Sequence, residues 1–143
     1  MIIAKMNEAH VAEVAALEAH CFSEPWSEKS VASELTNPLS LWLVALEGEN
    51  VIGYVGSQTV MGWTDMMNVA VHPDHRRRGV GKALVRELHQ IAGERLAGGG
   101  EENIIMYTCA NENATGFYEK LGMVKPDDIY MLNKVAWTDF TVE

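Results

Sequence analysis

The sequence predicts a mixed α/β domain, of the α+β kind, built around one central sheet. Apolar runs of β-forming residues alternate along the chain with stretches whose apolar residues recur at helical spacing. Two of the β-forming runs flank a short turn that contains a glycine, as in a hairpin. With 143 residues the chain is long enough for one substantial core, so we expect a single domain over residues 1–143.

The first third of the chain predicts a short strand and two helices. A strand at 2–6 precedes a helix that Asn7 can cap, and Ser27 is a suitable cap for a second helix. The second helix ends before Pro38, because the residue before a proline is pushed out of the α region. The apolar stripe of the first helix comprises Val11, Val14, Leu17 and Cys21.

The rest of the chain predicts five more strands and two more helices. The run at 65–71 is uniformly apolar, which is typical of a central strand, and a long helix begins at Val80 and is stopped by the glycines at 98–100. The expected order is β-α-α-β-β-β-α-β-α-β. The remaining strands are expected at 41–46, 51–60, 103–109 and 129–135, and the remaining helix between Asn111 and Gly122.

Composition and charge narrow the classes of protein and partner. The chain is 48% hydrophobic and 22% charged, which is ordinary for a soluble globular protein, and its net charge of −9 argues against a nucleic-acid partner. No apolar run approaches the ~20 residues that cross a bilayer, and no signal peptide is recognisable. The two cysteines are far apart and match no metal-binding spacing. We therefore expect a cytoplasmic protein with reduced thiols and no membrane partner.

A basic loop joins the central strand to the long helix. The first turn of a helix leaves backbone N–H groups free, and glycines at 79 and 81 remove side chains where a phosphate must approach closely. The arginines before them add charge-assisted hydrogen bonds. These features predict an anion site, with an ordinary helix start and a solvated basic face as the alternative.

The spacing of the loop excludes two common nucleotide-binding motifs. A Walker loop requires Ser or Thr after the Gly-Lys pair, and Ala83 stands there. The dinucleotide fingerprint requires a third glycine where Leu84 stands. The stretch "HPDH" at 72–75 offers only two ring nitrogens in a loop, so we expect no metal.

The motif "RRRGVG" resembles the acetyl-coenzyme A loop of the GNAT superfamily of N-acetyltransferases. "NVAVHP" precedes the motif, and "NENATGFYEKLGM" follows about thirty residues later, as in that family, with Met123 at the position of the usual Phe. The resemblance implies the GNAT fold, a central mixed sheet flanked by helices. It also implies acetyl-CoA as the co-substrate.

The resemblance assigns coenzyme-binding roles to the strand, the loop and one later asparagine. Backbone groups of the strand before the loop would contact the pantetheine arm and the thioester carbonyl, and the loop would hold the pyrophosphate. The residues so implied are Val69, Ala70, Val71, Arg76, Arg77, Arg78, Gly79, Val80, Gly81, Lys82 and Asn111.

Two residues are candidates for proton transfer. Tyr118 matches the family tyrosine that protonates the leaving thiolate, and a phenol with a pKa near ~10 is protonated at neutral pH. The alternative is a core tyrosine. Asp65, at the start of the strand 65–71, is the candidate base, acting through a water because Asp is short; the alternative is a solvent-facing strand end.

The segment "CFSEPWSEKSVASEL" at 21–35 is similar to one in RimI-type enzymes, which acetylate the amino-terminal alanine of a small-subunit ribosomal protein. That resemblance implies a substrate groove lined by Phe22, Pro25 and Trp26, with a purely structural corner as the alternative. Met106 stands where RimI-type proteins carry a glutamate base.

We therefore predict an acyltransferase that moves acetyl from acetyl-CoA to an amine, with a protein amino terminus as the acceptor and a ribosomal protein among the candidates. The alternatives are a GNAT enzyme acting on a small amine or amino acid, and a non-catalytic acetyl-CoA sensor. The sequence predicts no oligomeric state.

Overall fold

The computed structural model describes residues 1–22, 24–60, 63–95, 105–108 and 130–132. One sheet contains the six described strands in sequence order, and every neighbouring pair is antiparallel except β4 and β5, which are parallel. The strands are β1 (Ile2–Lys5), β2 (Ser40–Glu47), β3 (Asn50–Val60), β4 (Trp63–Val71), β5 (Ile105–Thr108) and β6 (Tyr130–Leu132).

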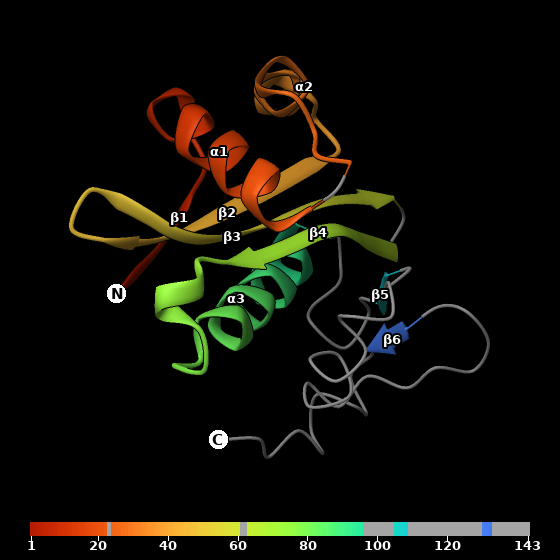
Figure 1. Ribbon diagram of the computed structural model, residues 1–143. Helices are drawn as coiled ribbons and strands as arrows, with labels where there is room; N and C mark the ends of the chain where they lie inside the picture. The colour runs from red at the N-terminus through yellow and green to blue at the C-terminus, as the bar shows by residue number, and fades with distance from the viewer. Residues whose placement is uncertain (23, 61–62, 96–104, 109–129, 133–143) are drawn as a thin grey trace.

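Helices cover both faces of the sheet, as Figure 1 shows. Helices α1 (Val11–Cys21) and α2 (Glu28–Ser33) lie on one face, and α3 (Val80–Arg95) lies on the other. Three short 3-10 helices complete the described part: η1 (Glu8–His10), η2 (Glu34–Thr36) and η3 (Pro73–His75). The predicted α+β architecture with one central sheet is confirmed.

The predicted caps of the first two helices are present. Asn7 accepts the Ala9 N–H at 2.8 Å, but it caps η1, so the α-helical turns begin only at Val11. Ser27 accepts the Ser30 N–H at 3.1 Å at the start of α2.

The strand expected at 65–71 starts two residues earlier, at Trp63, and is central as predicted. It pairs with β3 along its length, whereas its parallel ladder with β5 has three register pairs and ends at Asp65 opposite Tyr107. Beyond Asp65, no described strand lies along that side of β4. In the carboxyl-terminal half of β4, the backbone edge opposite β3 therefore has no described strand beside it.

A β-bulge lies in the middle of β4. Gly56 pairs with Asn68 and Ser57 pairs with Met66, so Met67 is an extra residue on the β4 side. Gly56 is required at this point, because a Cβ there would lie 2.5 Å from ring atoms of Trp42. The extra residue reverses the alternation of side chains over the end of the strand.

Two apolar clusters, one on each face, hold the helices to the sheet. The α3 cluster contains the fully buried Leu84 and Leu88, as the helical stripe from Val80 predicts, together with Met66 from β4. The opposite cluster contains Val14, Val31, Trp42 and Tyr54. Because of the bulge, Val69 and Val71 pack against the first cluster while Met67 and Ala70 belong to the second.

Several predictions concern residues outside the described part. The helix between Asn111 and Gly122 and the glycine stop at 98–100 lie there, as do the ends of the strands expected at 103–109 and 129–135. The described cores of those two strands, β5 and β6, are confirmed. Among the described residues, no helix has the length and apolar character needed to span a membrane.

Candidate functional site

The loop between β4 and α3 has an unusual backbone. Arg77 and Gly79 both have positive φ, at 64° and 79°, which places them in the left-handed region. A Cβ added at Gly79 would meet nothing within 4 Å, so the space beside this glycine is open. A non-glycine residue with positive φ stores backbone strain, and such strain gathers at ligand-binding turns.

The start of α3 faces this loop. The Ala83 N–H donates to the Gly79 carbonyl at 3.0 Å as the first bond of the helix, and the amides before Ala83 therefore have no acceptor within the helix. The side chains of Arg77 and Arg78 are exposed. Amides at a helix start, together with cationic side chains, favour an anion.

Arg76 is held differently from the other two arginines. Its Nε donates to the Val71 carbonyl at 3.0 Å, and its Nη2 lies 3.6 Å from the Cys21 Sγ. The guanidinium therefore connects the end of β4 to the end of α1. This geometry makes Arg76 a brace for the loop, although its side chain is exposed like those of Arg77 and Arg78.

Asp65 lies within β4 and is half-buried rather than a solvent-facing strand end. Burial raises the pKa of its carboxyl above the ordinary Asp range. In the β4–β5 ladder, Thr64 pairs with Met106 and Asp65 pairs with Tyr107. The predicted base is thus one register step from the backbone position of Met106, at the point where the ladder ends.

The side chain of Glu18, a buried carboxylate on α1, accepts hydrogen bonds from three segments that are far apart in the sequence. Glu18 has no exposed surface, and its Oε1 accepts hydrogen bonds from the Tyr54 hydroxyl at 2.5 Å and from the Asn68 side-chain amide. Its Oε2 accepts the Trp26 backbone N–H at 2.9 Å. The pKa of Tyr54 is raised mainly by burial, and further by its hydrogen bond to Glu18 and by repulsion from that side chain. The phenol therefore stays protonated and remains a donor.

Sequence reasoning missed this group, although a signal for it exists. Glu18 stands four residues after Val14 and three before Cys21, so helical spacing puts this acid on the apolar stripe. Asn68 is likewise a polar residue inside an apolar strand. An acid at a core position requires donors, because a buried unpaired charge is strongly unfavourable.

The predicted substrate segment is anchored in the same region. Trp26 is half-buried, and its ring centroid lies 5.4 Å from that of Trp42, which stacks on Tyr54 at 5.9 Å. Phe22 packs against the same cluster, whereas Pro25 is exposed. Trp26 and Phe22 therefore turn inward, and Pro25 forms the outer point of the corner.

The structure brings most of the predicted site together around β4. The strand residues 69–71, the loop 76–82 and the corner at 25–26 all adjoin β4 or α1. Asn111 and Tyr118 lie outside the described residues, so their predicted roles stay predictions. Among the described residues, no group of three His, Cys, Asp or Glu side chains could hold a metal ion.

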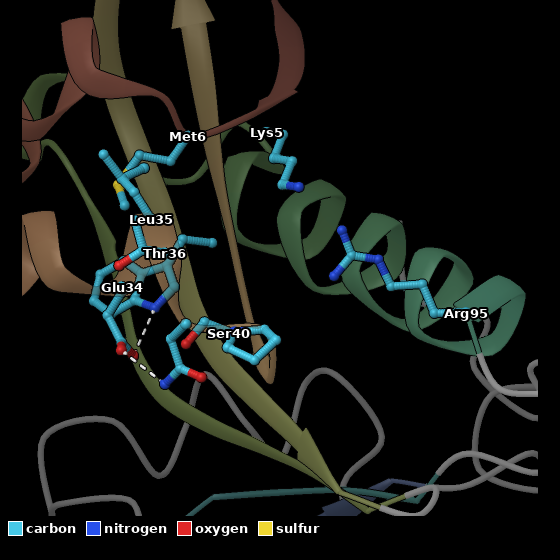
Figure 2. Close-up of a pocket in the computed structure, with 10 residues that line it drawn as sticks. Lys5, Met6, Glu34, Leu35, Thr36, Ser40 and Arg95 are labelled. Carbon is cyan, nitrogen blue, oxygen red and sulfur yellow. Dashed lines mark hydrogen bonds between the residues drawn. The ribbon is translucent and has the colours of Figure 1, made fainter.

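A separate cavity of about 340 Å³ lies at the other end of α3 (Figure 2). Arg95, the last residue of that helix, lies on one side of the cavity with Lys5. Glu34 lies on the other side, where it accepts a hydrogen bond from the Trp42 Nε1 at 3.3 Å. The cavity contains none of the predicted site residues and is distinct from the loop.

Comparison of the sequence with known proteins identifies a family and several relatives. The model of the acetyltransferase (GNAT) family matches residues 11–123. A Bacillus subtilis protein provisionally named a ribosomal protein bS18-alanine N-acetyltransferase is 31% identical over 115 residues, covering 80% of this chain and 72% of the relative. The Escherichia coli K12 ribosomal protein bS18-alanine N-acetyltransferase is 31% identical over 104 residues, covering 73% and 66%.

The fold is likewise that of an acetyltransferase. The crystal structure of the ribosomal-protein-S18-alanine N-acetyltransferase from Escherichia coli matches with a TM-score of 0.73 at 21% identity, covering 91% of this chain and 90% of that one. The predicted GNAT fold, the enzyme class and the resemblance to RimI-type proteins are confirmed. The matched residues 11–123 include the bulged strand and the glycine loop, and the chain belongs to the acetyltransferase (GNAT) family.

Proposed function

We propose that this protein transfers the acetyl group of acetyl-CoA to the α-amino group at the amino terminus of a protein. One observation carries the proposal. The Pro-Trp corner and the bulged strand β4 meet on a single carboxylate, because Glu18 accepts from both Trp26 and Asn68. A segment suited to an acceptor thus adjoins the strand assigned to the coenzyme.

The loop fits the pyrophosphate of acetyl-CoA. The loop has open space beside Gly79, a left-handed backbone at Arg77, amides at the start of α3 and exposed arginines, a combination suited to an anion. Arg77 and Arg78 would add charge-assisted hydrogen bonds, and the edge of β4 at 69–71, along which no described strand lies, would hold the pantetheine arm. The coenzyme would supply an activated thioester.

Acetyl transfer also needs proton movements that side chains can supply. The amine must lose a proton and the leaving thiolate must gain one. Asp65, with its raised pKa, would accept the first proton through a water, and Tyr118 would donate the second. An α-amino group has a pKa near 8, so roughly a quarter of it is already neutral at pH 7.5. A weak base therefore suffices for this acceptor.

The names of the relatives suggest the acceptor class. Two of them are named for acetylating an alanine of ribosomal protein bS18. A net charge of −9 suits an acceptor bearing an ammonium group. We therefore propose a protein with a small amino-terminal residue, bS18 being the first candidate, and a cytoplasmic reaction.

We expect peptides with a free amino-terminal alanine to be acetylated at least ~tenfold faster than matched amino-blocked peptides that offer only lysine. The lysine amine, with a pKa near 10.4, needs a stronger base than the α-amine does. The test is kcat/KM by release of free thiol, with mass spectrometry of the acetylated position. Preference for lysine or polyamines would support a small-amine enzyme instead. Coenzyme binding without turnover of any amine would support a sensor.

A second prediction concerns coenzyme binding. Gly79→Ala should weaken coenzyme A binding at least ~tenfold, because it puts a Cβ into the space assigned to the pyrophosphate and strains a left-handed backbone. Gly48→Ala is the matched control, since Gly48 has φ 61° and an equally open Cβ position in the β2–β3 turn. Titration calorimetry should find its affinity unchanged. Equal coenzyme A affinity in Gly79→Ala and Gly48→Ala would mean that this loop does not bind the coenzyme.

A further inference from the structure

We infer that Glu18 is a positioning residue that fixes the acceptor corner at Trp26 against the bulged strand β4 through hydrogen bonds. The inference rests on the proposed function, since it assigns the corner to the acceptor. It concerns a residue that touches neither substrate. Glu18 is fully buried, so its carboxylate cannot act as the base that meets the amine.

The donors to Glu18 come from segments that are far apart in the sequence. Trp26 lies in the connection between α1 and α2, Tyr54 in β3 and Asn68 in β4. The carboxylate joins the corner to the strand by hydrogen bonds. If no acceptor stood at position 18, each of these donors would lose its partner, which is unfavourable for groups shielded from water.

The bulge explains why Asn68 can reach this carboxylate. Asn68 follows the extra residue Met67, and after this residue Asn68 and Ala70 lie on the face of the sheet that packs on α1. Without the extra residue, Asn68 would alternate onto the α3 face. The bond to Glu18 thus holds the altered register just before residues 69–71, the edge assigned to the thioester.

The relative positions of the acceptor amine and the thioester depend on the hydrogen bonds of Glu18 to Trp26 and Asn68. Transfer requires the amine and the thioester carbon to approach within about 3–3.5 Å, and a misplacement of about 1 Å can cost a hundredfold in rate. The corner would orient the acceptor and β4 would orient the acetyl group. A single carboxylate that accepts from both sides sets the distance between them.

The three donors allow hydrogen bonding to be separated from charge. A hydroxyl and a side-chain amide can each rotate to present an acceptor, but the Trp26 backbone N–H can only donate. Glu18→Gln can therefore turn its oxygen to Trp26 and its NH₂ to the rotated groups of Tyr54 and Asn68. Glu18→Met is of similar size, and its thioether sulfur is at most a weak acceptor.

We expect Glu18→Met to lower the kcat/KM for the acceptor peptide at least ~tenfold while coenzyme A affinity changes by less than about twofold. Glu18→Gln should keep kcat/KM within about threefold of the wild type. Glu13→Met is the matched control, because Glu13 lies on the same helix and accepts the Val51 N–H at 2.7 Å, away from the corner. It should leave acceptor kinetics unchanged.

A second readout does not depend on turnover. Hydrogen exchange of the Trp26 amide should be slow in the wild type and in Glu18→Gln, and at least ~tenfold faster in Glu18→Met, where this N–H loses its carboxylate acceptor. A wild-type protein that acetylates no amine would refute the proposed function, while this exchange still tests the positioning. If Glu18→Met does not fold, Asn68→Ala takes its place in the kinetic assay, because it frees β4 from the carboxylate.

Three results would overturn the inference. Equal losses in Glu18→Gln and Glu18→Met would make the charge of Glu18, not its hydrogen bonds, responsible. Unchanged acceptor kinetics in both Glu18→Met and Asn68→Ala would make the carboxylate a core group only. An unchanged rate of Trp26 amide exchange in Glu18→Met would mean that the corner is held by its aromatic packing on Trp42.

Discussion

Replacing Tyr118 by phenylalanine is expected to lower kcat by about 10²–10⁴ while leaving acetyl-CoA affinity nearly unchanged. The change deletes one hydroxyl and keeps the ring. By resemblance to the GNAT family, that hydroxyl protonates the thiolate as it leaves, and a phenol is protonated at neutral pH. Steady-state release of free thiol gives kcat, and titration calorimetry gives the affinity.

Tyr54→Phe is the matched control for the loss of a phenol. Tyr54 donates to Glu18 in the core, and after its removal the carboxylate keeps two other donors. We expect this variant to lose about 1–2 kcal/mol of stability and to lower kcat by much less than Tyr118→Phe does. Full turnover in folded Tyr118→Phe would make Tyr118 a core residue and would require another proton donor.

Local chemistry predicted most of the fold. The side chains of Asn7 and Ser27 cap elements because short polar groups bond nearby amides, a preference that needs no tertiary contact. The stripe from Val80 predicts the buried face of α3 for the same reason, since helical period alone brings its apolar residues together. The start of β4 was two residues off because Trp63 and Thr64 extend the ladder with β3.

The parts that sequence reasoning missed depend on tertiary contacts. The bulge at Met67 changes the face of every following residue in β4, and alternation along one strand does not reveal it. The role of Arg76 as a brace depends on the Val71 carbonyl and Cys21, which only the folded chain brings near. Glu18 stands on an apolar stripe, but its three donors come from separate segments.

Asp65→Asn is expected to lower kcat/KM for an amino-terminal peptide by about 10–10² near pH 7, with a smaller loss at pH 9. A base acts only when ionised, and burial raises the pKa of Asp65 above the ordinary Asp range. The wild-type kcat/KM should therefore rise with pH through that raised pKa, and the variant should lack this rise. Toward pH 9 most of the α-amine is already neutral, so the base contributes less.

Asp74→Asn is the matched control, because it removes the same charge near the loop. Asp74 is an exposed carboxylate that lies 3.8 Å from the His72 Nδ1. Its ratio to the wild type should stay constant from pH 5 to pH 9. A constant ratio for Asp65→Asn as well would exclude Asp65 as the base. The α-amine would then lose its proton to solvent, and the same profile would follow the titration of the peptide alone. That outcome would also remove the need for any carboxylate at the end of the β4–β5 ladder, where Asp65 pairs with Tyr107 next to the pair of Thr64 and Met106.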